Sequence, residues 1–237
     1  LPAPACCRNQ DQRIPPACTW ELHAELGRCL AEIEDGIGVD QPCLLSACYR
    51  AGVPIFVGAP QDGSIFLNVV KLKALYGEAF QLSLDVTQDV SDMAALQWLA
   101  QNEGQTAVWI LGGGVPKNYT LQGEPTLGQI LGLDARGFDL DLQFCVDPVD
   151  NGALSSCPAG EGHTWGKVSA ECVETSSVYV HTDVTAVLPF LVHGLFQQGA
   201  QRPQKRLLDR MGEARAKLVA DMADKRAGLL EELESAD

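Results

Sequence analysis

Residues 106–122 read TAVWILGGGVPKNYTLQ and indicate the fold class. The apolar run Ala107–Leu111 is followed directly by three glycines, Gly112 to Gly114. A short apolar run that ends on glycine predicts a strand buried on both faces. Glycines at a strand end let the backbone approach a ligand, and the free N–H groups of a following helix suit an anion. An ordinary tight turn is the alternative, because GGG lacks the G-x-G-x-x-G spacing of dinucleotide-binding loops.

The bulk composition excludes several classes of protein. The 237 residues are 46% hydrophobic and 20% charged, which is typical of a globular protein. The net charge of −14 argues against nucleic-acid and anionic-membrane partners, because both bind basic surfaces. No apolar run approaches the roughly 20 residues of a membrane span.

Nine cysteines are scattered along the chain without a C-x-x-C pair. This pattern favours free thiols in a reducing compartment, either cytoplasmic or organellar, and we expect no metal site. A disulfide among Cys6, Cys7 and Cys18 remains the alternative.

The chain is expected to have three parts. Residues 1–18 are rich in Pro and Cys and predict an irregular arm. Residues 19–200 predict one α/β domain, in which 147–163 form a long irregular loop and 184–198 a buried apolar helix. Residues 201–237 predict a charged C-terminal helix, beginning near Gln204.

Strands alternate with helical segments in the middle part. The predicted strands are Val53–Val57, Ala107–Leu111, Asp139–Cys145 and Ser177–His181. Such alternation predicts a parallel, Rossmann-like sheet with flanking helices. The loops after the four strands would then lie at one edge of the sheet, where open α/β sheets bind ligands.

Four motifs in order carry a family resemblance. They are AGVPIFVGAPQDGSI from Ala51, ILGGGVPKNYTLQ from Ile110, a Gly/Ser-rich loop running to TWGKV at 164–168, and YVHTDVTAVLPFLV from Tyr179. Together they resemble the deoxyhypusine synthase family over about residues 20–196. The GGGVPKN wording with Leu154 is most similar to its bacterial-type, deoxyhypusine synthase-like branch.

The resemblance implies a Rossmann-like fold, bound NAD, and usually a homotetramer with active sites at a dimer interface. Deoxyhypusine synthases dehydrogenate spermidine with NAD. They pass its aminobutyl group through an imine on an enzyme lysine to a lysine of a translation factor precursor. Relatives make homospermidine by passing the group to a free amine.

The resemblance also implies roles for residues of a substrate pocket. Lys167 matches the imine-forming lysine, whose nucleophilic amine needs the lowered pKa that burial would provide. Trp165 matches a pocket wall against the polyamine, and Glu161 matches an acid that holds a substrate ammonium. Asn118 stands where the eukaryotic enzymes have a histidine, and asparagine cannot titrate. His163 is a weaker candidate for a substitute base.

A cofactor site is implied in the same way. Asp62 and Asp183 match positions that line the NAD site, where a carboxylate can accept from ribose hydroxyls. Gly112, Gly113 and Gly114 would lie close to the cofactor. For Asp62, a turn-forming Asp-Gly pair is the alternative.

Two departures leave the function open. Leu67 and Leu154 replace acids that hold spermidine's amines in the eukaryotic enzymes, and apolar residues cannot compensate a buried ammonium. The family's N-terminal part is also expected to be missing, so that a second copy or a partner chain would cover the exposed apolar faces. The sequence therefore predicts an NAD-dependent transferase that moves an aminoalkyl group from a polyamine. The alternative is a catalytically inactive relative, without NAD, serving as a structural or regulatory subunit of a larger assembly.

Overall fold

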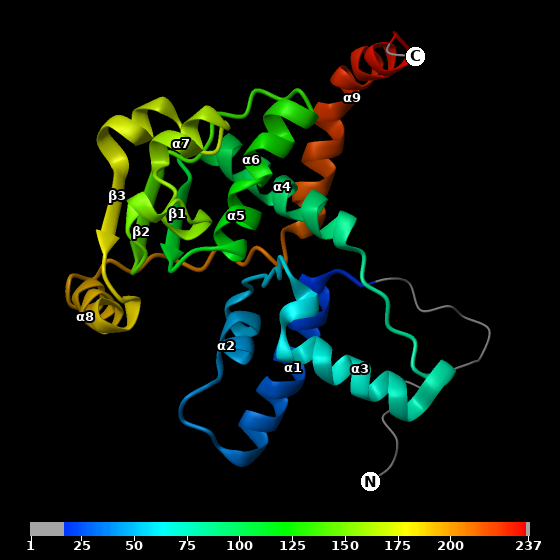
Figure 1. The fold of residues 1–237 in the computed structure, drawn as a ribbon. Coiled ribbons are helices and arrows are strands. Elements are labelled where there is room, and N and C mark those ends of the chain that lie inside the picture. Colours follow the sequence, from blue (N-terminus) through cyan, green and yellow to red (C-terminus); the bar gives the residue numbers. More distant parts are fainter. Residues whose placement is uncertain (1–16, 236–237) are drawn as a thin grey trace.

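The computed structural model describes residues 17–235 (Figure 1). The strands are β1 (Ala107–Leu111), β2 (Leu140–Cys145) and β3 (Ser177–His181). The helices are α1 (Thr19–Ile37), α2 (Leu44–Ala51), α3 (Ser64–Tyr76), α4 (Val86–Glu103), α5 (Val115–Leu121), α6 (Gly123–Pro125), α7 (Ala159–Thr164), α8 (Val184–Gln197) and α9 (Met211–Ser235). Short 3₁₀ or π turns are η1 (Pro60–Asp62), η2 (Gly77–Ala79), η3 (Thr126–Ile130), η4 (Val149–Asn151), η5 (Leu154–Ser156) and η6 (Cys172–Ser176).

The strands form a parallel sheet in the order β1-β2-β3, as the alternating pattern predicts. Trp109 pairs with Leu142, and Leu142 pairs with Val178. A bridge between Phe138 and Val168 extends the β2 edge toward the loop that carries Lys167. Parallel neighbours need crossover helices, and α5, α6, α7 and the intervening turns supply them.

The two faces of the sheet differ in burial, so the prediction that β1 is buried on both faces is wrong. Val108 and Ile110 are buried against Leu121 of α5. Trp109 and Leu111, which alternate with them, are exposed. Side chains along a strand point to opposite faces, and the described residues cover only part of the second face.

A helical layer beside the sheet holds a second core. The buried side chains come from α4, α9 and the segment after α6: Ala94, Ala95, Leu96, Leu99, Leu127, Leu133, Met211, Ala214 and Leu218. Asp92 of α4 ties the layer to α1, because it is fully buried and accepts hydrogen bonds from Arg215 at 2.6 Å and from Trp20 at 2.8 Å. Here a buried carboxylate has a charged partner and several donors, the condition under which burial is tolerated.

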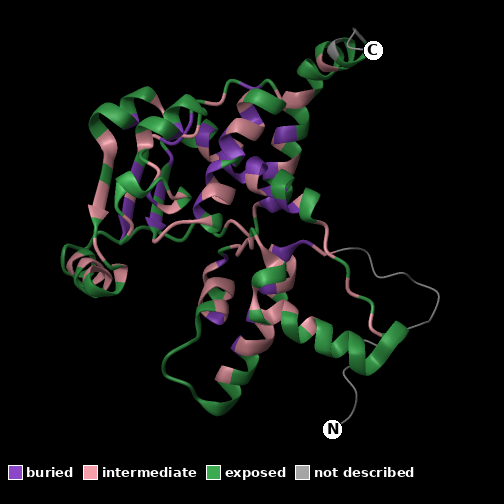
Figure 2. Cartoon of the chain, viewed as in Figure 1, coloured by how far each residue is buried: buried purple, intermediate pink, exposed green. Residues whose placement is uncertain are grey.

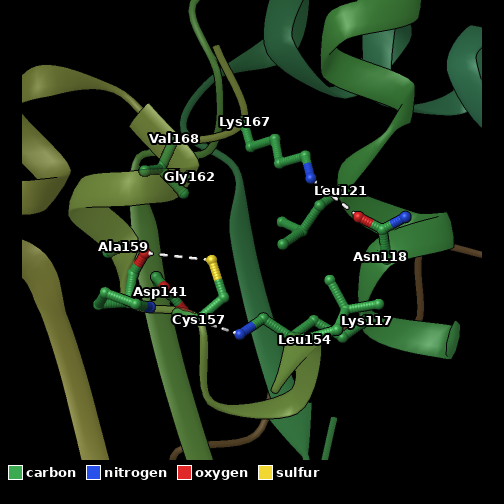
Figure 3. Close-up of a pocket in the computed structure, with 11 residues that line it drawn as sticks. Lys117, Asn118, Leu121, Asp141, Leu154, Cys157, Ala159, Gly162, Lys167 and Val168 are labelled. Atoms are coloured by element: carbon green, nitrogen blue, oxygen red, sulfur yellow. Dashed lines mark hydrogen bonds between the residues drawn. The ribbon is translucent and has the colours of Figure 1, made fainter. Parts of the chain in front are cut away.

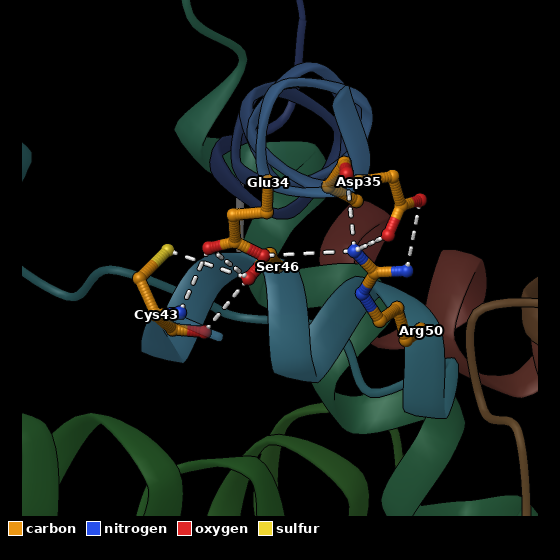
Figure 4. Close-up of polar contacts among 6 residues, drawn as sticks. Glu34, Asp35, Cys43, Ser46 and Arg50 are labelled. Carbon is orange, nitrogen blue, oxygen red and sulfur yellow. Dashed lines mark hydrogen bonds and ion pairs between the residues drawn. The ribbon is translucent and has the colours of Figure 1, made fainter. Parts of the chain in front are cut away.

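Helices α1 and α2, near the N-terminal end of the described residues, pack against each other and are joined by hydrogen bonds and an ion pair (Figure 4). Glu34 accepts from the Ser46 hydroxyl at 2.8 Å and from the backbone N–H of Cys43 at 2.9 Å. These bonds lower the pKa of Glu34. Arg50 pairs with Asp35 at 2.8 Å across the same two helices.

The structure corrects several predicted boundaries. Residues 53–57 form no strand in the described part of the chain, and the Val57 N–H donates to the Thr19 hydroxyl at 3.1 Å. The predicted loop 147–163 contains η4, η5 and all of α7 except its last residue. The C-terminal helix begins at Met211 rather than near Gln204. Residues 1–16 of the predicted arm, with Cys6 and Cys7, lie outside the described residues. Its last two residues are ordered differently from the prediction, since Ala17 bridges to Leu84 and Cys18 is a buried free thiol.

Helix α8 was expected to be buried, and this prediction is wrong. The helix follows the carboxyl end of β3 and carries no buried residue (Figure 2). Phe190 on it is 79% exposed, because nothing in residues 17–235 packs over that side chain. Its apolar character does not indicate a membrane span: within the described part of the chain, no helix has the length and apolarity to cross a bilayer.

Candidate functional site

A pocket lies on the buried face of β2, between α5, η5 and α7 (Figure 3). Its lining comes from five places in the chain: Lys117, Asn118, Leu121, Asp141, Leu154, Cys157, Pro158, Ala159, Gly162, Lys167 and Val168. The free volume inside the pocket is about 20 Å³, roughly the space of one water molecule, and the remaining hollow is open to solvent. Apolar walls with a few convergent polar groups are typical of small-molecule sites.

Lys167 and Asn118 meet in this pocket. The Lys167 ammonium donates to Oδ1 of Asn118 at 2.8 Å. The backbone holds Lys167 in place, because its carbonyl accepts from the Phe138 N–H at 3.1 Å and its N–H donates to the Gly162 carbonyl at 3.0 Å. Two residues singled out separately in the sequence are thus brought together, with one orienting the amine of the other.

A second lysine, Lys117, lies deeper in the pocket and was given no role by sequence reasoning. It is 7% exposed. Its ammonium donates to Oε1 of Gln143 at 2.8 Å, to the Cys157 carbonyl at 2.8 Å and to the Ser155 carbonyl at 3.4 Å. Burial lowers the pKa of Lys117. The sequence signal that could have found Lys117 is its position shortly after the three glycines, because the first residues of α5 then lie back over the strand.

Among the described residues that line the pocket, Asp141 is the one carboxylate, and sequence reasoning missed it as well. It precedes Gln143 by two residues on β2, so both side chains point to the same face. Asp141 is 9% exposed, and within residues 17–235 its Oδ1 atom has no hydrogen-bond partner. Burial raises the pKa of Asp141, and the charge of Lys117 opposes that rise. Strict alternation along 140–145 was the signal that could have found it.

The glycine turn, Gly112 to Gly114, packs against η5, which forms one side of the pocket. A Cβ on Gly113 would lie 2.5 Å from Cα of Ser155, so only glycine permits the close approach of η5. Gly112 and Gly114 have φ of 90° and 78°, a region that favours glycine. Nothing lies within 4 Å of where their Cβ atoms would be. The turn therefore has one side filled by the chain and another side open.

The other predicted substrate residues lie outside the pocket lining. Trp165 is 57% exposed, and its carbonyl accepts from Gln129 at 2.9 Å. Glu161 is exposed on α7. His163 is also exposed, and its Nδ1 atom lies 3.0 Å from the Val168 carbonyl. Leu154 lines the pocket as an apolar wall, and Leu67 is exposed on α3.

The predicted cofactor residues occupy two separate places. Gly112, Gly114 and Asp183 lie at the carboxyl edge of the sheet, after β1 and β3. Asp62 ends η1 and is exposed, in the segment that leads into α3. Asp183 caps α8 through Oδ1, which accepts from the N–H and hydroxyl of Thr185. Asp183 is exposed, and the hydrogen bonds from Thr185 lower the pKa of its carboxyl.

The parallel sheet and the pocket that contains two lysines define the class: an α/β protein with a candidate small-molecule site near the glycine turn. Comparison with known proteins gives the family: the family model for deoxyhypusine synthase matches residues 5–195, and the chain belongs to that family.

Curated relatives agree with the family model. The chain is 41% identical over 204 residues to a deoxyhypusine synthase-like protein of Nostoc sp., covering 86% of this chain and 52% of that protein. It is 38% identical over 199 residues to the protein of that description in Thermosynechococcus vestitus, covering 82% and 49%. A probable deoxyhypusine synthase 2 of Methanosarcina mazei is 33% identical over 161 residues, covering 68% and 44%. The chain thus spans about half the length of the curated relatives it matches.

Proposed function

We propose that the pocket performs aminoalkyl transfer, with Lys167 as the nucleophile that carries the group of a polyamine as an imine. The observation that carries this proposal is the position of Lys167, whose amine points into a walled pocket and is oriented by Asn118 at 2.8 Å. An amine held in a fixed direction near apolar walls meets the geometric need of a nucleophile.

Each pocket residue has a separate role in the proposed reaction. After its ammonium has lost a proton to solvent, the Lys167 amine would attack the C=N carbon of a polyamine that NAD had dehydrogenated. The remaining N–H proton of Lys167 would pass to the departing amine, whose C–N bond breaks, and the imine would be left on Lys167. Asn118 accepts a hydrogen bond from the Lys167 amine and orients it, but it cannot take its proton. Leu121, Leu154 and Val168 line the pocket and would pack along the methylene chain.

NAD would be held by Asp183 and by the open glycines Gly112 and Gly114, and it would accept and return hydride. Asp62 and Gly113 belong to the proposed cofactor set through the family resemblance. The family generally works as oligomers, so a second copy or another chain is the proposed partner over the exposed apolar surfaces.

Borohydride trapping tests the proposal. The full-length protein is incubated with spermidine and NAD, reduced with borohydride, digested and analysed by mass spectrometry. We expect an aminobutyl adduct on the peptide that contains Lys167, and no adduct in Lys167→Arg. An adduct on Lys117 alone, or none on either lysine, contradicts the proposed role of Lys167.

A second function is favoured by the exposure of Trp165 and Glu161 and by the leucine at position 154. In this alternative the protein is a catalytically inactive structural or regulatory subunit. Lys167→Arg would then leave its biological role intact, and no NAD would copurify with the assembly in native mass spectrometry.

A further inference from the structure

The contact between Lys167 and Asn118 joins two separate segments of the chain. Asn118 belongs to a helical segment that begins with α5 and continues through α6 and η3 to Ile130. Lys167 belongs to the turn that follows α7. Its ammonium donates to Oδ1 of Asn118 at 2.8 Å, and Figure 3 shows the side chain reaching across to α5. The position of the amine therefore depends on how these two segments are held against each other.

A second hydrogen bond joins the same two segments at their other ends. Nε2 of Gln129, on η3, donates to the Trp165 carbonyl at 2.9 Å. Within residues 17–235, that carbonyl accepts from no other donor. The next residue, Gly166, has a φ of 71°, a region that favours glycine. A Cβ on Gly166 would lie 3.7 Å from Nε2 of Gln129, so the Gln129 amide lies against the turn that leads into Lys167.

Gln129 is attached to a packed element although its own side chain is exposed. The Leu131 N–H donates to the Thr126 carbonyl at 3.0 Å, five residues back, which makes η3 a π turn. Such turns change which side chains share a helix face, and they are frequent at functional sites. Leu127 in the same turn is fully buried in the helical core. The core therefore fixes the backbone from which the Gln129 amide reaches Trp165.

The other bonds of the turn hold the backbone of Lys167 but not the peptide group before it. The Lys167 N–H donates to the Gly162 carbonyl at 3.0 Å, and the Lys167 carbonyl accepts from the Phe138 N–H at 3.1 Å. The peptide between Trp165 and Gly166 has its carbonyl fixed by Gln129 instead. Without that bond the peptide is free to rotate, and the direction of the Lys167 side chain changes with it.

We propose that Gln129 is a positioning residue for Lys167: its amide fixes the turn at Trp165 and Gly166, and so keeps the Lys167 amine directed at Asn118. The inference rests on the proposed function for its effect on the reaction, and on the two contacts alone for the position of the amine. Loss of the Gln129 donor should release the amine from Asn118 and leave it more open to reagents in solution.

Competitive chemical labelling tests the position of the amine apart from catalysis. The full-length protein is treated with a trace of acetic anhydride at fixed pH, and mass spectrometry gives the labelling rate of each lysine. Gln129→Glu keeps the shape of the side chain and removes the donor. We expect the labelling rate of Lys167, relative to exposed Lys71, to rise about fivefold, the factor that one net hydrogen bond controls.

Two further variants separate the hydrogen bond from the added charge. Gln122→Glu places the same charge at an exposed position of the same helical segment, and its Lys167 labelling should match the wild type. Gln129→Arg supplies an N–H donor again and should return the Lys167 rate toward the wild-type value.

Equal Lys167 labelling in the wild type and in Gln129→Glu would overturn the inference. So would a rise of the same factor at buried Lys117, because Gln129 would then support the whole domain rather than the turn. Borohydride trapping with spermidine and NAD distinguishes this inference from the proposed function. No adduct in the wild type, with labelling that depends on Gln129, removes the proposed function and keeps the inference. A Lys167 adduct, with labelling that ignores Gln129, does the reverse.

Discussion

The two faces of β1 differ although the strand is apolar along its whole length. Val108 and Ile110 are sealed beneath α5, while Trp109 and Leu111 are exposed. Gln143 and Asp141 point to this same buried face of the sheet. The two pocket lysines approach it from α5 and from the loop after α7. The comparison teaches that this chain completes one side of the sheet, with a polar pocket inside it, and leaves apolar surface on the other side and on α8.

The largest expected effect comes from the buried lysine of the sealed face. Lys117→Met should lower the free energy of unfolding by about 3 kcal/mol, because it removes the donor to Oε1 of Gln143 and to the Cys157 carbonyl. Chemical denaturation measures this. Lys71→Met, at an exposed position on α3, should change it by less than about 0.5 kcal/mol. A stabilised Lys117→Met protein would show that the ammonium is not committed to those acceptors.

Glu124 tests how well the helical layer that continues from α5 excludes water. Burial raises the pKa of Glu124 from 4.5 to about 7, against hydrogen bonds from Gln101. The folded state then keeps a proton that the unfolded state loses, so the free energy of unfolding falls as pH rises from about 4.5 to about 7. The expected fall is about 3 kcal/mol.

Denaturation at a series of pH values measures this dependence. Glu124→Gln should flatten the curve over that window, whereas Glu174→Gln, at an exposed position on η6, should keep the wild-type slope. If the wild-type curve is flat from pH 4.5 to 7, Glu124 is hydrated and the layer is open.

The glycine turn gives a smaller effect on the same side. Gly113→Ala should cost about 2 kcal/mol and weaken ligand binding in the pocket, because the added Cβ pushes η5 away from the turn. Gly160→Ala on α7 is the matched control, since nothing lies within 4 Å of its Cβ position. Equal melting temperatures for the two variants would argue against the close contact with Ser155.

The smallest effect is expected on the exposed side. Phe190→Gln on α8 should change the free energy of unfolding of this chain by less than about 0.5 kcal/mol, because Phe190 is 79% exposed. Phe138→Gln, on the sealed side, should cost about 3 kcal/mol. A large cost at Phe190, seen only at high protein concentration, would mean that an assembled form buries α8.

Local sequence patterns predicted β1, β2 and β3 almost to the residue, since apolar runs bounded by glycine or polar residues have few other structures open to them. They failed at residues 53–57, where a run of the same character pairs with no strand in the described residues. Apolar content alone cannot tell which neighbour a segment will have. The buried state predicted for α8 failed for the same reason.

Some residues of the candidate site could be predicted from sequence motifs, and others could not. The motifs placed Lys167, Asn118 and the glycine turn in one family pattern, and the structure brings Lys167 and Asn118 together at 2.8 Å. The pattern was silent on Asp141, because a single acid in an alternating strand becomes notable only once its hydrogen bonds are known.

The sequence by itself determined the parallel α/β class and the family, because both depend on residue type and order along the chain. Tertiary structure alone decided which face of the sheet is buried, that Lys117 has three acceptors and that Oδ1 of Asp141 has no donor within residues 17–235. Those properties depend on the distances between segments far apart in the sequence, and packing of α5, η5 and α7 against β2 sets those distances.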